Sequence, residues 1–182
     1  VSIVNLVSDI INNTFTGVGS VTTYTDWSGK TGASDVVYAG NSAKNNGIQL
    51  RTTNSNSGIV STTSGGCIKS VTVKWNANCT SGRVLDVYGK NSAYTTAADL
   101  YNSTNKGSKL GSITEGSTTT FTITGNYAYV GVRSNDGALN MCKRCATLHV
   151  NNWEPETFLW ILQELDVPWI PDKWNELLAR YR

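Results

Sequence analysis

The sequence predicts an all-β protein, an antiparallel β-sandwich of the jelly-roll kind with a short helical appendage at its C-terminal end. Short stretches of alternating apolar and polar residues recur over roughly the first 150 residues, as half-buried strands require. Turns rich in Gly, Ser and Asn separate these stretches. No segment with a helical period lies between them, which disfavours a parallel α/β fold.

The clearest expected strand is 68–75, in which Val71, Val73 and Trp75 point to one face and the polar residues between them to the other. The stretch 93–101 could form a single helical turn or a loop, and we expect a loop. Eight to ten short strands at such spacing are typical of a sandwich or jelly roll. The other expected strands are 21–24, 35–38, 47–51, 59–62, 83–88, 118–124, 127–133 and 147–150.

The composition changes near residue 153, because all three prolines and four of the six tryptophans lie beyond residue 152. We therefore expect an N-terminal extension (1–10), a β-sandwich module (11–152) and a tail of two short helices (153–182). Helices this short are marginal alone, so their apolar faces must pack on the sandwich or on another chain. The residues expected to dock on a partner are Phe158, Leu162, Leu165, Trp174, Leu177 and Leu178.

Charge and hydropathy exclude several classes of function. Residues 1–152 contain 12 Lys and Arg against 7 Asp and Glu, a difference of +5, and residues 153–182 contain 3 against 6, a difference of −3. The basic residues are scattered and not interleaved with aromatics, so no nucleic-acid partner is expected. No apolar run approaches the roughly 20 residues of a membrane span. No secretory signal is visible at the first residues, so an exported chain would already have lost it.

Six linked motifs carry a resemblance to a known kind of module. They are NNTFTG at 12–17, YTDWSGKTG at 24–32, VYAGNSA at 37–43, IQLR at 48–51, NSGIV at 56–60 and LDVYG at 85–89. Over residues 11–138 the chain resembles Ser/Thr/Gly-rich jelly-roll modules in extracellular and surface proteins of gut Bacteroidota. The resemblance implies a secreted or cell-surface protein with a role in binding or in architecture. It does not specify an activity. The helical tail and the insertion NMCKRC at 140–145 depart from it.

No catalytic set is expected from the sequence. The one histidine, His149, lies in an expected strand, where it is more often structural or solvent-facing than catalytic. A pair of carboxylates can hydrolyse a glycoside, but the seven acidic residues of the body are scattered and no motif pairs them. We therefore expect a protein that is not an enzyme and that carries no cofactor.

The four cysteines leave three alternatives open. Cys67 and Cys79 bracket an expected strand, and Cys142 and Cys145 form a C-x-x-C pair. Export favours disulfides, while free thiols or a tetrahedral zinc site would also use these residues. The spacing is unusual for zinc, and we expect no metal.

A ligand site is expected at aromatic residues flanked by polar ones, as in sugar-binding sandwiches. Trp27 beside Asp26 is the strongest candidate for a surface aromatic, with Tyr24 nearby; Asp26 or Asp35 could instead hold calcium. The other candidates are Tyr38, Arg133, Tyr94 and Tyr101. The expected function is a non-catalytic module that binds carbohydrate or a cell-surface component. The alternative is a structural subunit of a filament, virion or surface layer, a homo-oligomer whose terminal segments dock on neighbours.

Overall fold

The computed structural model describes residues 6–45, 47–52, 55–77, 79–116, 120–135, 137, 139–142 and 150–153. Antiparallel strands dominate these residues, which confirms the predicted all-β fold. All of them belong to one compact unit, residues 5–153. The tail residues from Glu154 onwards lie outside the described residues, so the helices and docking residues expected there (Phe158, Leu162, Leu165, Trp174, Leu177 and Leu178) stay predictions.

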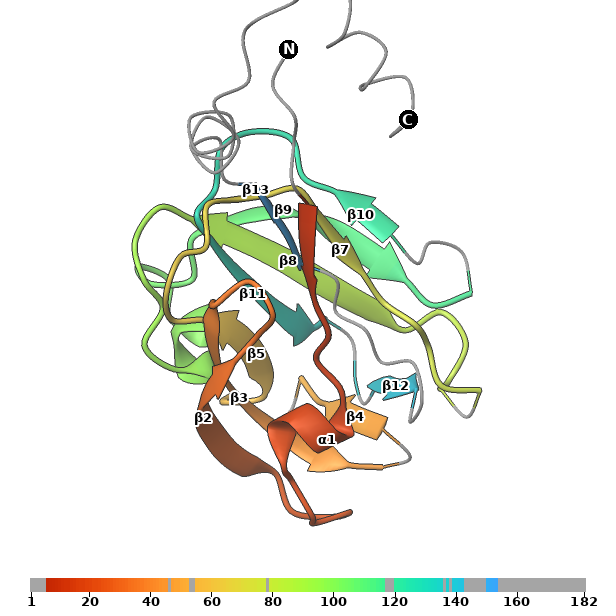
Figure 1. Ribbon diagram of the computed structural model, residues 1–182. Coiled ribbons are helices and arrows are strands. Elements are labelled where there is room, and N and C mark those ends of the chain that lie inside the picture. The colour runs from red at the N-terminus through yellow and green to blue at the C-terminus, as the bar shows by residue number, and fades with distance from the viewer. Residues whose placement is uncertain are drawn as a thin grey trace, which may run out of the picture. The chain divides into compact units, whose positions relative to one another are not determined.

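One large antiparallel sheet forms the body of the protein (Figure 1). Its strands follow the order β12, β4, β3, β5, β11, β8, β9, and β2 pairs with β3 beside that path. The strands are β2 (Thr25–Thr31), β3 (Val37–Lys44), β4 (Gly47–Leu50), β5 (Gly58–Ser61), β8 (Val84–Lys90), β9 (Ser108–Thr114), β11 (Tyr129–Ser134) and β12 (Leu139–Cys142).

A second layer covers the face that we call the inner face. It consists of a three-stranded sheet in the order β1 (Leu6–Asp9), β13 (Val150–Trp153), β6 (Cys67–Ile68), and of the pair β7 (Ser70–Thr72) and β10 (Thr120–Thr122). Ile68, Val71 and Val73 of this layer belong to the same buried cluster as side chains of the large sheet. Those partners include Tyr38, Ile59, Leu85, Val87, Ile113, Val130 and Val132.

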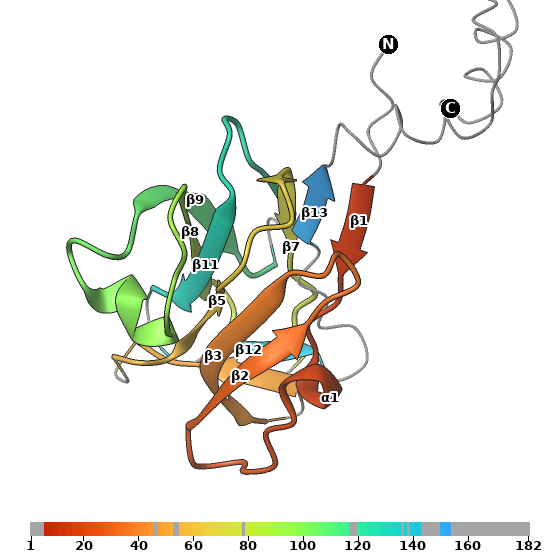
Figure 2. The ribbon, with the colours of Figure 1, turned by 60° about the vertical axis from the view of Figure 1, so that its left-hand side comes forward.

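The opposite, outer face of the large sheet is covered by a loop that contains the 3-10 helix η1 (Ala97–Tyr101). Figure 2 shows this green helical turn and the β1–β13 pair on opposite sides of β11 and β5. Leu100 of η1 is fully buried and lies against Gly58 and Gly131, where a Cβ on either glycine would overlap its side chain. The loop expected over 93–101 is wrong for residues 97–101, which form η1; Asp99 in the first turn of η1 accepts the backbone N–H of Thr95 at 2.7 Å.

The N-terminal strand is fixed to the body by a buried carboxylate. β1 pairs with β13 from Leu6↔Trp153 to Asp9↔Val150, so the expected extension 1–10 is part of a sheet from Leu6 onwards. Asp9 is fully buried and accepts from the Ser34 backbone N–H and the Tyr38 hydroxyl, each at 2.7 Å. A short helix, α1 (Asn13–Thr16), follows, and the Asn12 side chain caps it by accepting from the Phe15 N–H.

Several expected strands differ from those of the structure. The strand expected at 21–24 is wrong: residues 21–23 bend, with the Thr23 N–H donating to Ser20 Oγ, and β2 begins at Thr25. The run 68–75 divides into β6 and β7, which pair with different neighbours. Val71 and Val73 are nevertheless buried as predicted. Of the strand expected at 147–150, only Val150 is described, as the first residue of β13.

None of the helices in the described part of the chain is long and apolar enough to cross a membrane.

Candidate functional site

A hollow of about 210 Å³ lies between the edge strand β2 and the start of η1. Its polar lining residues are Asp26 and the hydroxyl-bearing Ser28, Thr95 and Thr96. Its apolar lining comes from Trp27, Ala39, Gly40 and Ala97. Because β2 and β3 supply one wall and the outer loop supplies the other, the hollow depends on the helical turn at η1.

Trp27 is not the exposed aromatic that the sequence predicts. Its side chain is 7% exposed, and its ring lies under Gly40, where a Cβ would overlap it. Trp27 Nε1 donates to Ser42 Oγ at 3.1 Å, and the ring meets Phe15 edge to face. Alternation along β2 places Trp27 on the inner face and Asp26 on the outer one. Trp27 therefore cannot provide a stacking platform for the hollow.

Asp26 is exposed at the rim of the hollow. Asn41, its partner across the β2–β3 pairing, donates from Nδ2 to Asp26 Oδ1 at 2.8 Å. Asn41 is 4% exposed, so its side chain is held by its surroundings. This contact orients the Asp26 carboxylate and leaves its second oxygen available to accept from a ligand.

Tyr38 and Tyr94 are structural residues and not surface candidates. Tyr38 is fully buried, and its hydroxyl donates to Asp9. Tyr94 is 1% exposed, and its hydroxyl donates to the Lys106 carbonyl at 2.8 Å. Burial raises the pKa of both phenols, so both remain donors at neutral pH. The expected role of Tyr38 in ligand binding is therefore wrong, because alternation along β3 turns it into the core.

Tyr24 and Arg133 belong to one group of stacked side chains, which we call the arginine–tyrosine cluster: Tyr24, Arg51, Tyr88, Tyr101 and Arg133. The Arg51 guanidinium lies 4.9 Å from the centre of the Tyr24 ring. The Arg133 guanidinium lies 4.7 Å from the centre of the Tyr101 ring and 5.3 Å from that of Tyr88. The Tyr101 hydroxyl links the two halves, since it contacts the Arg51 carbonyl at 3.3 Å and donates to the Ser57 carbonyl at 2.7 Å.

Burial raises the pKa of Tyr101 to about 12, although the nearby Arg133 guanidinium opposes this rise. Burial also raises the pKa of Tyr24, against the influence of Arg51. Both phenols are therefore uncharged at neutral pH, and neither neutralises the arginine that it contacts.

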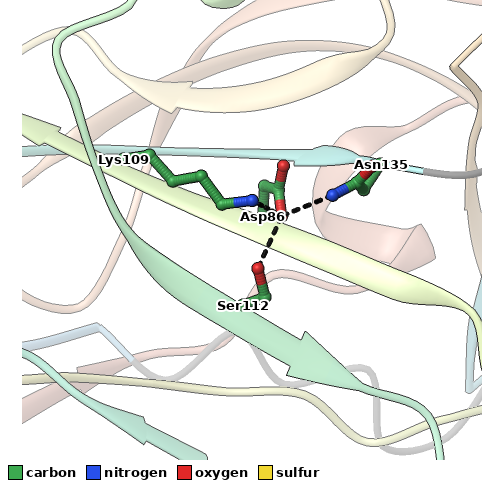
Figure 3. A network of polar contacts seen from close by, with 4 residues as sticks. All are labelled: Asp86, Lys109, Ser112 and Asn135. Atoms are coloured by element: carbon green, nitrogen blue, oxygen red, sulfur yellow. Dashed lines mark hydrogen bonds and ion pairs between the residues drawn. The ribbon is translucent and has the colours of Figure 1, made fainter.

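A buried carboxylate lies farther along the outer face. Asp86 is 3% exposed. Its Oδ1 forms an ion pair with Lys109 Nζ at 2.8 Å and accepts hydrogen bonds from Ser112 Oγ at 2.7 Å and Asn135 Nδ2 at 3.1 Å (Figure 3). This contact set satisfies a charge that burial would otherwise penalise.

Asp26 and Asp86 do not form a glycosidase pair. Asp26 lies on β2 and Asp86 on β8, four strand spacings away through β3, β5 and β11, which amounts to about 19 Å. Paired hydrolytic carboxylates stand within roughly 10 Å of one another. The other candidate catalytic residue, His149, lies outside the described residues.

The cysteines are only partly described. Cys67 is a free thiol that donates to Asn126 Oδ1 at 3.9 Å, which is one of the three alternatives that the sequence leaves open. Cys79 is buried beside the turn at Asn76. Cys142 ends β12, its side chain is not described, and Cys145 lies outside the described residues. Among the residues that the structure describes, no three His, Cys, Asp or Glu side chains gather as metal ligands.

The structure thus places Asp26 and Trp27 among the lining residues of the hollow, and Tyr24 and Arg133 in the arginine–tyrosine cluster. Sequence reasoning missed Ser28, Thr95, Thr96 and, above all, Arg51. Arg51 follows the buried strand β4 directly, and a charged residue directly after a strand is a usable signal. Thr95 and Thr96 carry no such signal, because only the folding of the outer loop onto the sheet places them near β2.

No protein-family model, no curated protein and no solved structure matches this chain. The geometry of the hollow and of the arginine–tyrosine cluster is therefore the basis on which a function can be proposed.

Proposed function

We propose that this protein is a non-catalytic binding module that holds one sugar residue of a glycan in the hollow between β2 and η1. The observation that carries the proposal is the lining of the hollow, which combines an oriented carboxylate and three hydroxyl groups with an apolar surface. Sugar sites need both parts, because a pyranose ring presents hydroxyls at its edge and C–H groups on its faces.

Each part of the lining has a role in this proposal. Asp26 accepts hydrogen bonds from sugar hydroxyls. Asn41 already holds the Asp26 carboxylate in position, so binding does not have to order this side chain. Thr95 and Thr96 donate and accept from the opposite wall. Ala39 and Ala97 contact the C–H groups. A volume of about 210 Å³ lies below the usual range for drug-sized ligands, which favours a single sugar unit at a time.

The test is glycan binding by the full chain and by two carboxylate variants. Asp26→Asn should weaken binding of the best glycan on an array by at least tenfold, since a hydrogen bond to a charged acceptor contributes about 1.5–3 kcal/mol. Asp35→Asn is the matched control, because Asp35 is also exposed but lies in the turn between β2 and β3. Failure of the chain to bind any glycan, or equal binding by both variants, would show that the proposal is wrong.

As a glycan-binding module the protein would work outside the cell, secreted or at the cell surface, where glycans are displayed. This location is part of the same proposal and is tested by fractionating the source cells.

A second candidate function is self-assembly, which one specific observation favours. β1 lies at the end of its sheet order, and Leu6 and Ile10, at and just after this strand, are each 51% exposed. A strand from a second copy could pair with β1 and cover both residues. Light scattering on the wild type and a Leu6→Lys variant tests this: an oligomer that Leu6→Lys dissociates supports it, and a monomeric wild type excludes it.

A further inference from the structure

Tyr24, a member of the arginine–tyrosine cluster, directly precedes β2 and stands two residues before Asp26, which lines the hollow. Within β2, alternation places Asp26 on the outer face, whereas Trp27 turns inwards. Two residues of extended chain span about 7 Å. A glycan whose terminal unit occupies the hollow would therefore present its next unit to Tyr24 and to Arg51, which is stacked on it.

Arg51 is held in place at several points. Its backbone N–H donates to Ser57 Oγ at 3.0 Å, its carbonyl is contacted by the Tyr101 hydroxyl at 3.3 Å, and its guanidinium lies over the Tyr24 ring. Among the described side chains, Tyr24 is the one that the guanidinium contacts, over its ring and as a hydrogen-bonding influence that opposes the rise in the Tyr24 pKa. A guanidinium has five N–H donors, so others remain for a ligand.

In the described part of the chain, neither arginine of the cluster forms an ion pair with an Asp or Glu. Asp86 is the cross-strand partner of Arg133 and pairs with Lys109, so Arg51 is the arginine of the cluster without a described acidic neighbour in the strand register. Arg133 is committed to the structure, because it donates from Nη1 to the Leu100 carbonyl at 3.0 Å and stacks on two tyrosines. Arg51 is half-buried and is the member that a ligand can reach.

A guanidinium with a fixed plane and unused edge donors matches the oxygens of a carboxylate or a sulfate. We propose that the site is selective for acidic glycans, and that Arg51 binds a carboxylate or sulfate group on the sugar unit next to the one in the hollow. This inference rests on the proposed glycan-binding function and names the class of glycan.

The test compares matched neutral, carboxylated and sulfated oligosaccharides on the full chain. We expect an acidic oligosaccharide to bind at least tenfold more tightly than its neutral counterpart, and added salt to reduce this preference. Arg51→Gln should abolish the preference, so that acidic and neutral oligosaccharides bind the variant with equal affinity. Lys30→Gln removes the same charge at the other end of β2 and should keep the preference. Whether carboxylated or sulfated sugars lose more identifies the anionic group.

Arg51→Lys is a second variant, which tests the inference if Arg51→Gln fails to fold. It keeps the charge but loses the planar fork, so it should retain only part of the preference. Glycan binding with equal affinity for neutral and acidic sugars in the wild type, or an unchanged preference in Arg51→Gln, overturns this inference and leaves the proposed function standing. Absence of binding to every sugar overturns the proposed function itself.

Discussion

At the residue scale, the protein uses buried phenols as hydrogen-bond donors. Tyr38 donates to Asp9, Tyr94 to the Lys106 carbonyl and Tyr101 to the Ser57 carbonyl, each across at least 12 residues of sequence. The Tyr38 contact joins the N-terminal strand to the large sheet, the Tyr94 contact closes the outer loop on itself, and the Tyr101 contact joins η1 to the residue before β5. Each contact needs a protonated phenol, and burial raises the pKa of all three, that of Tyr101 to about 12.

This burial predicts a loss of stability in alkali. In the unfolded chain the phenols ionise near their ordinary pKa of about 10, whereas in the folded protein Tyr101 keeps its proton until about pH 12. Between these values the folded state binds more protons than the unfolded state, so the free energy of unfolding should fall as pH rises above 10. Below pH 10 the full contribution of the phenols to the free energy of unfolding is present.

Urea unfolding from pH 7 to 11 measures this dependence. Tyr101→Phe should be less stable than the wild type at pH 7, because two carbonyls lose a donor, and its stability should fall less steeply above pH 10. Equal slopes for the two proteins would mean that Tyr101 titrates alike in the folded and unfolded states.

At the element scale, the loop that carries η1 decides whether the hollow exists. Leu100 fits against Gly58 of β5 and Gly131 of β11, and the Arg133 guanidinium donates to its carbonyl. This docking places Thr95, Thr96 and Ala97 opposite β2. The two glycines are needed here for close approach, since a side chain at either one would occupy the space of Leu100.

We therefore predict that Gly131→Ala lowers the free energy of unfolding and also displaces the loop wall of the hollow. The added methyl would overlap Leu100, and overpacking of this kind costs about 1–3 kcal/mol. In a Leu100→Ala background, which itself costs roughly 2–5 kcal/mol, Gly131→Ala should cost much less, because the clash is gone. Denaturant unfolding of the two single variants and the double variant measures this coupling. Additive losses would show that Leu100 does not pack on Gly131.

At the scale of the whole molecule, the sequence predicts the layers better than the site. The alternation of apolar and polar residues around Val71 and Val73 identifies the inner face. A strand that is buried on one side has an apolar residue at every second position, and this pattern can be seen in the sequence. The same rule, applied to Tyr24, Asp26 and Trp27, would have placed Trp27 opposite Asp26. The rest depends on which strands become neighbours: Asn41 meets Asp26, and Tyr101 meets Arg51, only through long-range pairing that no local pattern encodes.

The two ends of the described unit depend on each other, because β13 pairs on one side with β1 and on the other with β6. Trp153 pairs with both Leu6 and Cys67, so a chain cut after residue 152 would lose a paired residue at both contacts. We predict that a chain of residues 1–153 unfolds cooperatively, whereas a chain of residues 1–149 melts at least roughly 10 °C lower. Loss of β13 leaves β1 with no strand partner among those described, and a domain of this size loses about 2–4 °C of Tm per kcal/mol.

Calorimetry on both truncated chains measures this difference, and Leu6→Lys in the 1–153 chain serves as the control. That variant changes an exposed side chain of β1 without removing backbone pairing, so its Tm should stay close to that of the parent. If the 1–149 chain instead melts at the temperature of the 1–153 chain, the pairing of β1 with β13 contributes little. The N-terminal strand is then held mainly by the contacts of Asp9 with Ser34 and Tyr38.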